Sequence, residues 1–118
     1  MTRHRGFDVR VAPQVEQQLL RLAQRPGHSM VESRRIRAAL LLLESMGTRA
    51  SGTKKMKSLD LWEIRAGRYR LFFALVPGTS RIAVGALIAK DAQRIKMTRL
   101  KLIECKVHQW RDESQAER

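Results

Sequence analysis

A chain of 118 residues is long enough for one domain and too short for two, so a single domain over residues 1–118 is expected. Hydrophobic residues make up 43% and charged residues 30%, which excludes a disordered tail, and only 5% are aromatic, which predicts a mostly aliphatic core. With 24 Lys and Arg against 11 Asp and Glu, the formal net charge of +13 indicates a polyanionic or acidic target.

Cysteine and apolar content exclude further classes. The lone Cys105 rules out an internal disulfide, and three scattered histidines show no metal-ligand spacing, so no metal or other cofactor is expected. The longest apolar run, residues 38–43, is far shorter than the ~20 residues of a membrane span. No apolar segment follows the basic start of the chain, and we therefore expect a cytoplasmic protein with no membrane partner.

The first half of the chain predicts a strand followed by a helical hairpin. Alternating apolar and polar residues over 7–11 indicate a half-buried strand. A helix is expected from Pro13 to the Pro26-Gly27 breaker, with its apolar residues on one face. A second helix is expected over residues 29–46, because Ser29 and Glu32 form a capping-box pattern and Gly47 follows its end.

The second half predicts a sheet and a last helix. Strands are expected over residues 54–59, 61–66, 69–76 and 81–89. The last three, joined by tight turns, form an antiparallel meander. An apolar stripe predicts a helix over residues 98–110, and residues 111–118 are expected to be a polar, frayed tail. The order β-α-α-β-β-β-β-α predicts an α+β fold with the helices on one face of a small antiparallel sheet and the basic residues of the meander on the other.

The segment over residues 61–73 reads Leu-Trp-Glu-Ile-Arg-Ala-Gly-Arg-Tyr-Arg-Leu-Phe-Phe, and lysines stand before it at positions 54, 55 and 57. It resembles the core signature of the RelE/ParE superfamily, most closely its HigB, phage-derived branch, which also has a lysine where Lys90 ends the last strand. The resemblance implies a RelE-like fold and a toxin of a type II toxin–antitoxin pair. Most RelE- and HigB-like members cleave mRNA on the ribosome, whereas ParE-like members poison DNA gyrase.

Metal-free RNA cleavage proceeds by attack of a ribose 2′-hydroxyl on the adjacent phosphate, and fixed guanidinium groups stabilise the charge that gathers there. The Tyr-Arg pair of the family carries over to Arg70, our first choice for this role, with Arg65 beside it. Lys55 or Lys57 is expected as the general base, with plain phosphate contact as the alternative reading. Lys90 is expected as the acid or as a phosphate clamp. The residues expected to bind RNA are Lys54, Arg68, Arg94 and Lys96.

Other polar and aromatic residues receive smaller roles. His108 is a candidate acid or base, because several relatives use a C-terminal histidine or tyrosine, although a solvent-facing helical histidine is the alternative. Trp62 and Tyr69 are expected in the core. Glu63 is expected to pair with a nearby arginine. His4 and His28 receive no role.

Three departures from the family pattern keep the target open. Asp91 follows Lys90 where relatives carry a second cation, the final helix lacks a terminal tyrosine, and the turn before Tyr69 is short. The leading hypothesis is a ribosome-dependent endoribonuclease that acts on mRNA and is neutralised by an acidic or helix-turn-helix antitoxin. The alternatives are a ParE-like gyrase inhibitor without nuclease activity and a non-toxic nucleic-acid-binding protein.

Overall fold

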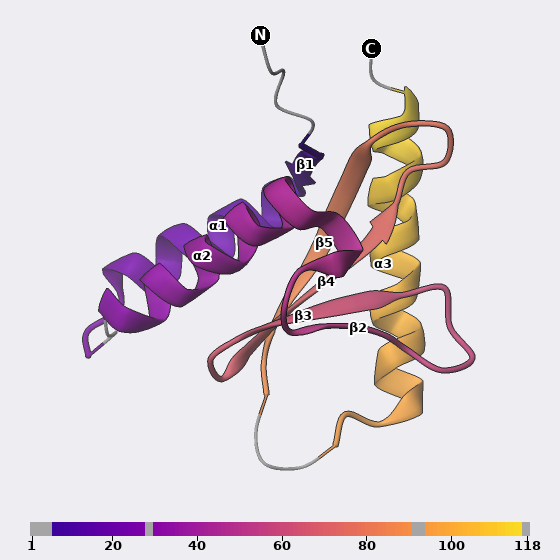
Figure 1. Ribbon diagram of the computed structural model, residues 1–118. Helices are drawn as coiled ribbons and strands as arrows, with labels where there is room; N and C mark the ends of the chain where they lie inside the picture. Colours follow the sequence, from indigo (N-terminus) through magenta and orange to yellow (C-terminus); the bar gives the residue numbers. More distant parts are fainter. Residues whose placement is uncertain (1–5, 28–29, 91–93, 117–118) are drawn as a thin grey trace, which may run out of the picture.

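The computed structural model describes residues 6–27, 30–90 and 94–116 (Figure 1). Their elements in chain order are β1 (Asp8–Val11), α1 (Pro13–Gln24), α2 (Met30–Met46), a 3-10 turn (Gly47–Arg49), β2 (Thr53–Lys55), β3 (Trp62–Ala66), β4 (Tyr69–Leu75), β5 (Arg81–Ala89) and α3 (Met97–Ala116). The predicted α+β class is confirmed. His4, His28, Ser29 and Asp91 lie outside the described residues, so the cap at Ser29 stays a prediction.

The sheet is mixed, and the prediction of a wholly antiparallel sheet is wrong. Within the described residues it has five strands in the order β1-β5-β4-β3-β2. β1 runs parallel to β5, with Asp8 opposite Arg81 and Val11 opposite Val84, while the other neighbours are antiparallel. Tight turns fix the directions within the meander, but the helical hairpin and three further strands separate β1 from β5, so no such turn sets the direction of β1.

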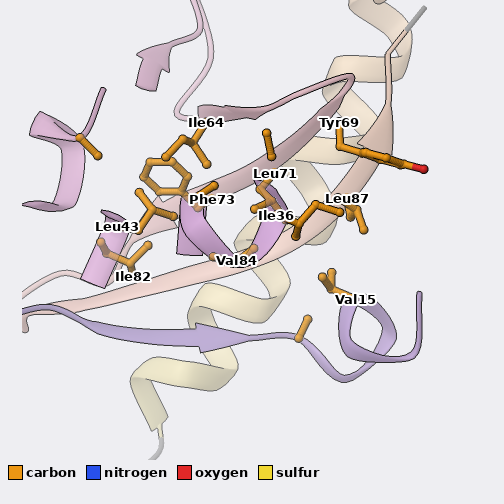
Figure 2. Packing of buried hydrophobic residues seen from close by; sticks show 14 residues of the cluster. Val15, Ile36, Leu43, Ile64, Tyr69, Leu71, Phe73, Ile82, Val84 and Leu87 are labelled. Atoms are coloured by element: carbon orange, nitrogen blue, oxygen red, sulfur yellow. The ribbon is translucent and has the colours of Figure 1, made fainter. Parts of the chain in front are cut away.

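Helices cover both faces of the sheet, which corrects the prediction that all of them lie on one face. The hairpin of α1 and α2 packs on one face, where Ile36, Leu43, Ile64, Leu71 and Phe73 belong to the same buried cluster (Figure 2). On the other face α3 packs over β5 and β4 (Figure 1). There Ile103 and Val107 contact a second buried cluster that includes Phe72, Ala74 and Ala86. The second face is therefore partly core and only partly basic.

Phe72 and Phe73 of β4 face the two different cores by ordinary strand alternation, and the pairing of β4 with β5 has a bulge at this point. Phe72 is opposite Ala86 and Phe73 is opposite Val84, which leaves Gly85 without a partner. Gly85 lies directly beneath α3, because a Cβ atom built on it would be 2.8 Å from the Cα atom of Val107. A residue without a side chain at this position allows the helix to lie close against the strand.

The last helix is longer than the expected 98–110, and residues 111–116 are not a frayed tail. Side chains tie its second half to the rest of the molecule. The Trp110 indole N–H donates to the Arg10 carbonyl at 2.9 Å, and Arg81 Nη1 donates to the Ser114 carbonyl at 2.7 Å. Ser114 itself is fully buried. These contacts keep the polar end helical although its sequence has no apolar stripe.

The edge strand is shorter than predicted. Instead of 54–59, β2 covers Thr53–Lys55, and the chain then forms a loop that closes where the Met56 N–H donates to the Leu61 carbonyl at 2.8 Å. Ser58 within this loop has a φ of 65°, a conformation incompatible with a continuing strand. Within the described residues, no helix has the length and apolar composition needed to cross a bilayer.

Candidate nucleic-acid interface

Strand alternation brings charged side chains of β2, β3 and β4 to the face that α3 partly covers. Glu63 and Arg65 point to this face, because Ile64 between them is buried in the cluster under the hairpin. Lys54 is directly opposite Glu63 across β2 and β3, and Arg70 is directly opposite Arg65 across β3 and β4. Residues in directly opposed positions share a face of the sheet. Two neighbouring rows of charged residues therefore lie beside the area covered by α3.

A cavity of about 690 Å³ opens on this face, lined by the loop after β2, by β2 and β3, by Lys90 and by residues 94–100 around the start of α3. Its volume is within the range of roughly 300–1,000 Å³ that is typical of ligand sites. It is lined by four cations, one carboxylate and four apolar side chains: Lys54, Lys57, Lys90, Arg94, Glu63, Met56, Ile95, Met97 and Leu100.

The four cations come from two separate segments that the fold brings together. Lys54 is on β2 and Lys57 follows it in the loop, while Lys90 and Arg94 follow β5. The Lys90 backbone N–H donates to the Arg68 carbonyl at 2.8 Å, so the end of β5 is attached to the turn between β3 and β4. A concave site lined by cations from two segments is suited to a chain of phosphates.

Arg70, our first choice for the catalytic arginine, is not turned toward the cavity. Its residue exposure is only 8%, and Nη1 donates to the carbonyls of Gly67 and Tyr69, both at 3.0 Å. Arg65, opposite it, is exposed and also does not line the cavity. Both arginines share the face of the cavity but lie in the next row of residues. In this conformation the Arg70 guanidinium holds the β3–β4 turn.

Three further predicted cations also lie outside the cavity. Lys55 points to the other face of β2, opposite Trp62, and its Nζ donates to the Leu59 carbonyl at 3.0 Å. The Arg68 guanidinium lies 5.6 Å from the centre of the Tyr69 ring. Lys96 is exposed just before α3. Of the residues expected to act on RNA, the cavity therefore contains Lys57, Lys90, Lys54 and Arg94.

His108 holds a loop and is not part of the cavity lining. Its Nε2 is 2.6 Å from the Asp60 carbonyl oxygen, so this nitrogen carries the proton and donates it. Two neighbours on α3 bind the same residue. Arg111 Nη1 contacts the Asp60 carboxylate at 3.1 Å, and the Asp60 N–H donates to Glu104 at 2.8 Å. His108 thus helps to fix the loop that carries Lys57.

Glu63 is the residue that sequence reasoning missed. We expected it to pair with an arginine, but no ion pair within 4.0 Å joins it to a cation of the described residues. It is half-buried and contributes the carboxylate of the cavity. Strand alternation in the sequence already places Glu63 on one face with Arg65, but only the observed pairing with β2 puts it beside Lys54.

Tyr69 is in the core, as predicted from its place beside Leu71. Only 4% of the residue is exposed, and it belongs to the cluster under the hairpin (Figure 2). Burial raises the pKa of the Tyr69 hydroxyl above its ordinary value of 10.0, and a hydrogen bond to Glu32 and the negative charge of that carboxylate raise it further. Trp62 also packs against this cluster, stacked on Phe73 with a distance of 6.2 Å between ring centres.

A second cavity, of about 550 Å³, lies on the hairpin side of the sheet. Its polar lining includes Arg21 of α1 and Arg25, which follows α1, and Tyr69 and Leu87 contribute from the sheet. It contains none of the residues expected to act on RNA. The cavity on the α3 side is therefore the stronger candidate site.

No protein-family model matches the chain, and neither does any curated protein in a sequence comparison. The described residues contain no group of three or more His, Cys, Asp and Glu side chains placed to hold a metal ion. The charged groups that line the cavity are the four cations and the Glu63 carboxylate.

Proposed function

We propose that this protein is the toxin of a type II toxin–antitoxin pair, related to the RelE/ParE superfamily and its HigB branch. Its proposed activity is ribosome-dependent, metal-free cleavage of mRNA in the cytoplasm, which stops translation. The observation that carries the proposal is the gathering of Lys54, Lys57, Lys90 and Arg94 around one cavity on the α3 side of the sheet. Lys54, Lys57 and Lys90 come from the region of the chain in which the resemblance to the family lies, and Arg94 follows that region.

The cavity fits a phosphodiester better than a small neutral ligand. Two lysines from β2 and the loop after it share the lining with a lysine and an arginine that follow β5, so a strand of RNA in the cavity would meet cations from both segments. The apolar part of the lining, which includes Met56 and Leu100, offers a surface against which a base can pack. In the transition state, negative charge gathers on the phosphoryl oxygens, so fixed cations stabilise the transition state more than they stabilise the ground state.

Arg70 has to leave its bonds to the β3–β4 turn before it can contact a phosphate. We assign the first phosphate contacts to the cavity cations and give Arg70 a role only after the turn rearranges on the ribosome. The proposed fold is RelE-like. The parallel β1 and the position of α3 on the second face are the features by which it departs from the layout that we expected.

The proposed partners are the ribosome with its mRNA and a cognate antitoxin, either an acidic or a helix-turn-helix protein. A net charge of +13 favours both a polyanion and an acidic protein. An antitoxin that covers the cavity would exclude RNA from it.

The test is a reconstituted translation reaction with purified protein, in which mRNA ends are mapped by primer extension. Wild-type protein is expected to stop synthesis and to produce cut mRNA. A Lys57→Ala/Lys90→Ala variant is expected to cut at least tenfold more slowly, since each loss removes a charged contact of roughly 1.5–3 kcal/mol. Lys55→Ala is the matched control, because Lys55 belongs to the same lysine run but lies outside the cavity. Arrested translation with intact mRNA would reject the nuclease proposal.

The second candidate is a ParE-like gyrase inhibitor without catalysis. The observation that favours it is the engagement of Arg70 with the turn and of His108 with Asp60, which leaves neither group in the cavity. In a supercoiling assay such a protein would trap cleaved DNA on gyrase, while translation would proceed normally. The two assays, run on one preparation, separate the candidates.

A further inference from the structure

The cavity brings one carboxylate, that of Glu63, among four cations, and we propose that Glu63 is the general base that takes the proton from the attacking ribose 2′-hydroxyl. This inference rests on the proposed ribonuclease function and deepens it. It replaces our expectation that Lys55 or Lys57 serves as the base.

The position of Glu63 is fixed by the fold. On the opposite face of the sheet, the next residue of the strand, Ile64, is fully buried under the hairpin and fixes the position of the strand. On one side it lies opposite Lys54, and on the other it lies opposite Phe72, which is fully buried under α3. The carboxylate thus stands at the boundary between the packed part of this face and the open cavity. A base held on a strand is positioned more firmly than one held on a loop.

The chemistry of the cavity favours a carboxylate over an amine as the base. A carboxylate oxygen accepts a hydrogen bond from a hydroxyl group, whereas an ammonium group can only donate one. Within the described residues no ion pair occupies the Glu63 oxygens, so they can accept a hydrogen bond from a hydroxyl. Lys55, one of the two amines that we expected to act, donates to the Leu59 carbonyl outside the cavity. The remaining amines are suited to binding phosphate.

The proposed step balances in atoms and charge. The 2′-hydroxyl gives its proton to a Glu63 carboxylate oxygen while the 2′-oxygen forms a bond to the adjacent phosphorus. The bond between phosphorus and the 5′-oxygen breaks, and the departing 5′-oxygen takes a proton from the ammonium group of Lys90, which lines the same cavity. The products are a 2′,3′-cyclic phosphate and a 5′-hydroxyl. No oxidant, reductant or metal ion takes part.

The test compares Glu63→Gln with wild type in single-turnover cleavage of mRNA on programmed ribosomes. Glutamine keeps the size of the side chain but cannot take the proton, so the cleavage rate should fall on the order of 10²–10⁴-fold. Binding to ribosomes that carry a 2′-deoxy, uncleavable mRNA should be unchanged or tighter, because a negative charge has left a cationic site. Glu63→Asp, which keeps the base at a shorter reach, should cut at an intermediate rate. Glu113→Gln, an exposed position on α3, is the matched control.

A substrate with sulfur in place of the 5′-bridging oxygen separates base from acid. A thiolate leaves without a proton, so the defect of Lys90→Ala should shrink on this substrate while the defect of Glu63→Gln should remain. If the Glu63→Gln defect disappears instead, Glu63 is not the base. Cleavage by Glu63→Gln within threefold of wild type also overturns the inference, and so does a change confined to binding or base preference. Wild-type protein that leaves all mRNA intact signals failure of the proposed function, before any variant is compared.

Discussion

Replacing Gly85 with alanine tests how closely α3 lies against the sheet. The added Cβ atom would be 2.8 Å from the Cα atom of Val107 and 3.1 Å from its Cγ2 atom. Carbon atoms in favourable contact are about 3.5–4.0 Å apart. The nearer obstacle is a backbone atom in the middle of a helix, so a change of rotamer cannot relieve the contact. The helix itself has to move away from β5 by somewhat less than about 1 Å.

The size of the effect follows from two opposing terms. Inserting a methyl group into a packed core costs about 1–3 kcal/mol. Alanine restricts the unfolded chain, which returns about 0.4–1 kcal/mol, since the backbone of Gly85 has no positive φ that would strain an alanine. We therefore expect Gly85→Ala to lower the free energy of unfolding by about 1–2 kcal/mol. For a chain of this length the melting temperature should fall by roughly 3–10 °C.

Urea unfolding followed by circular dichroism measures the loss, and hydrogen exchange of the Ile103 and Val107 amides locates it on α3. Gly78→Ala is the control, because Gly78 has a positive φ of 73° but no atom within 4 Å of its added Cβ. Its loss of stability should come from backbone strain and leave exchange in α3 unchanged. A free energy of unfolding for Gly85→Ala within about 0.5 kcal/mol of wild type would refute the argument that Val107 limits the approach of the helix.

Two further predictions concern pH and salt. Tyr69 is the one tyrosine of the chain, so absorbance at 295 nm should report the ionisation of its hydroxyl, with a midpoint above pH 10.0. Glu32→Gln should lower that midpoint but leave it above pH 10.0, because burial raises the pKa more than Glu32 does. Since the folded-state pKa of Tyr69 is raised, its contribution to stability is complete below pH 10.0 and is lost as the pH rises through the raised value, and a midpoint at or below 10.0 would contradict this. For single-stranded RNA, Lys57→Ala should reduce the slope of the logarithm of the binding constant against the logarithm of the salt concentration by about 0.7, and Lys55→Ala should leave this slope unchanged. Equal slopes for the two variants would show that RNA does not bind in the cavity.

Local structure was predictable because its signals are local. Apolar runs rich in aromatic and β-branched residues, separated by tight turns, define the meander, and β5 covers the expected residues Arg81–Ala89. The Pro13 and Gly47 positions mark helix boundaries close to those observed, since proline suits a first helical turn and glycine tolerates the φ of 61° found at Gly47. Each of these signals acts over a few residues and needs no knowledge of the remaining chain.

Layer positions were not predictable, because they depend on which elements share a core. The apolar stripe of α3 shows that one side is buried, but it does not say which face of the sheet buries it. Both Phe72 and Phe73 are fully buried, so β4 offers an apolar surface to each face. The polar residues 111–116 gave no reason to expect a helix either. Their contacts, such as Arg81 with the Ser114 carbonyl, join positions that lie far apart in the sequence.

The residues of the site also depend on contacts between distant parts of the chain, which local sequence signals do not reveal. A run of lysines predicts a basic surface but not which lysines act together. Lys55 and Lys57 are two residues apart and would share a face on a continuous strand, yet β2 ends at Lys55 and the following loop carries Lys57 into the cavity. The short strand is thus what separates the two lysines. Glu63 joins the cavity for the converse reason. Its strand is continuous, so alternation holds its carboxylate on the open face, where the end of α3 leaves it uncovered. A site of this kind needs a sheet that is only partly covered, and the position of α3 over β4 and β5 provides it.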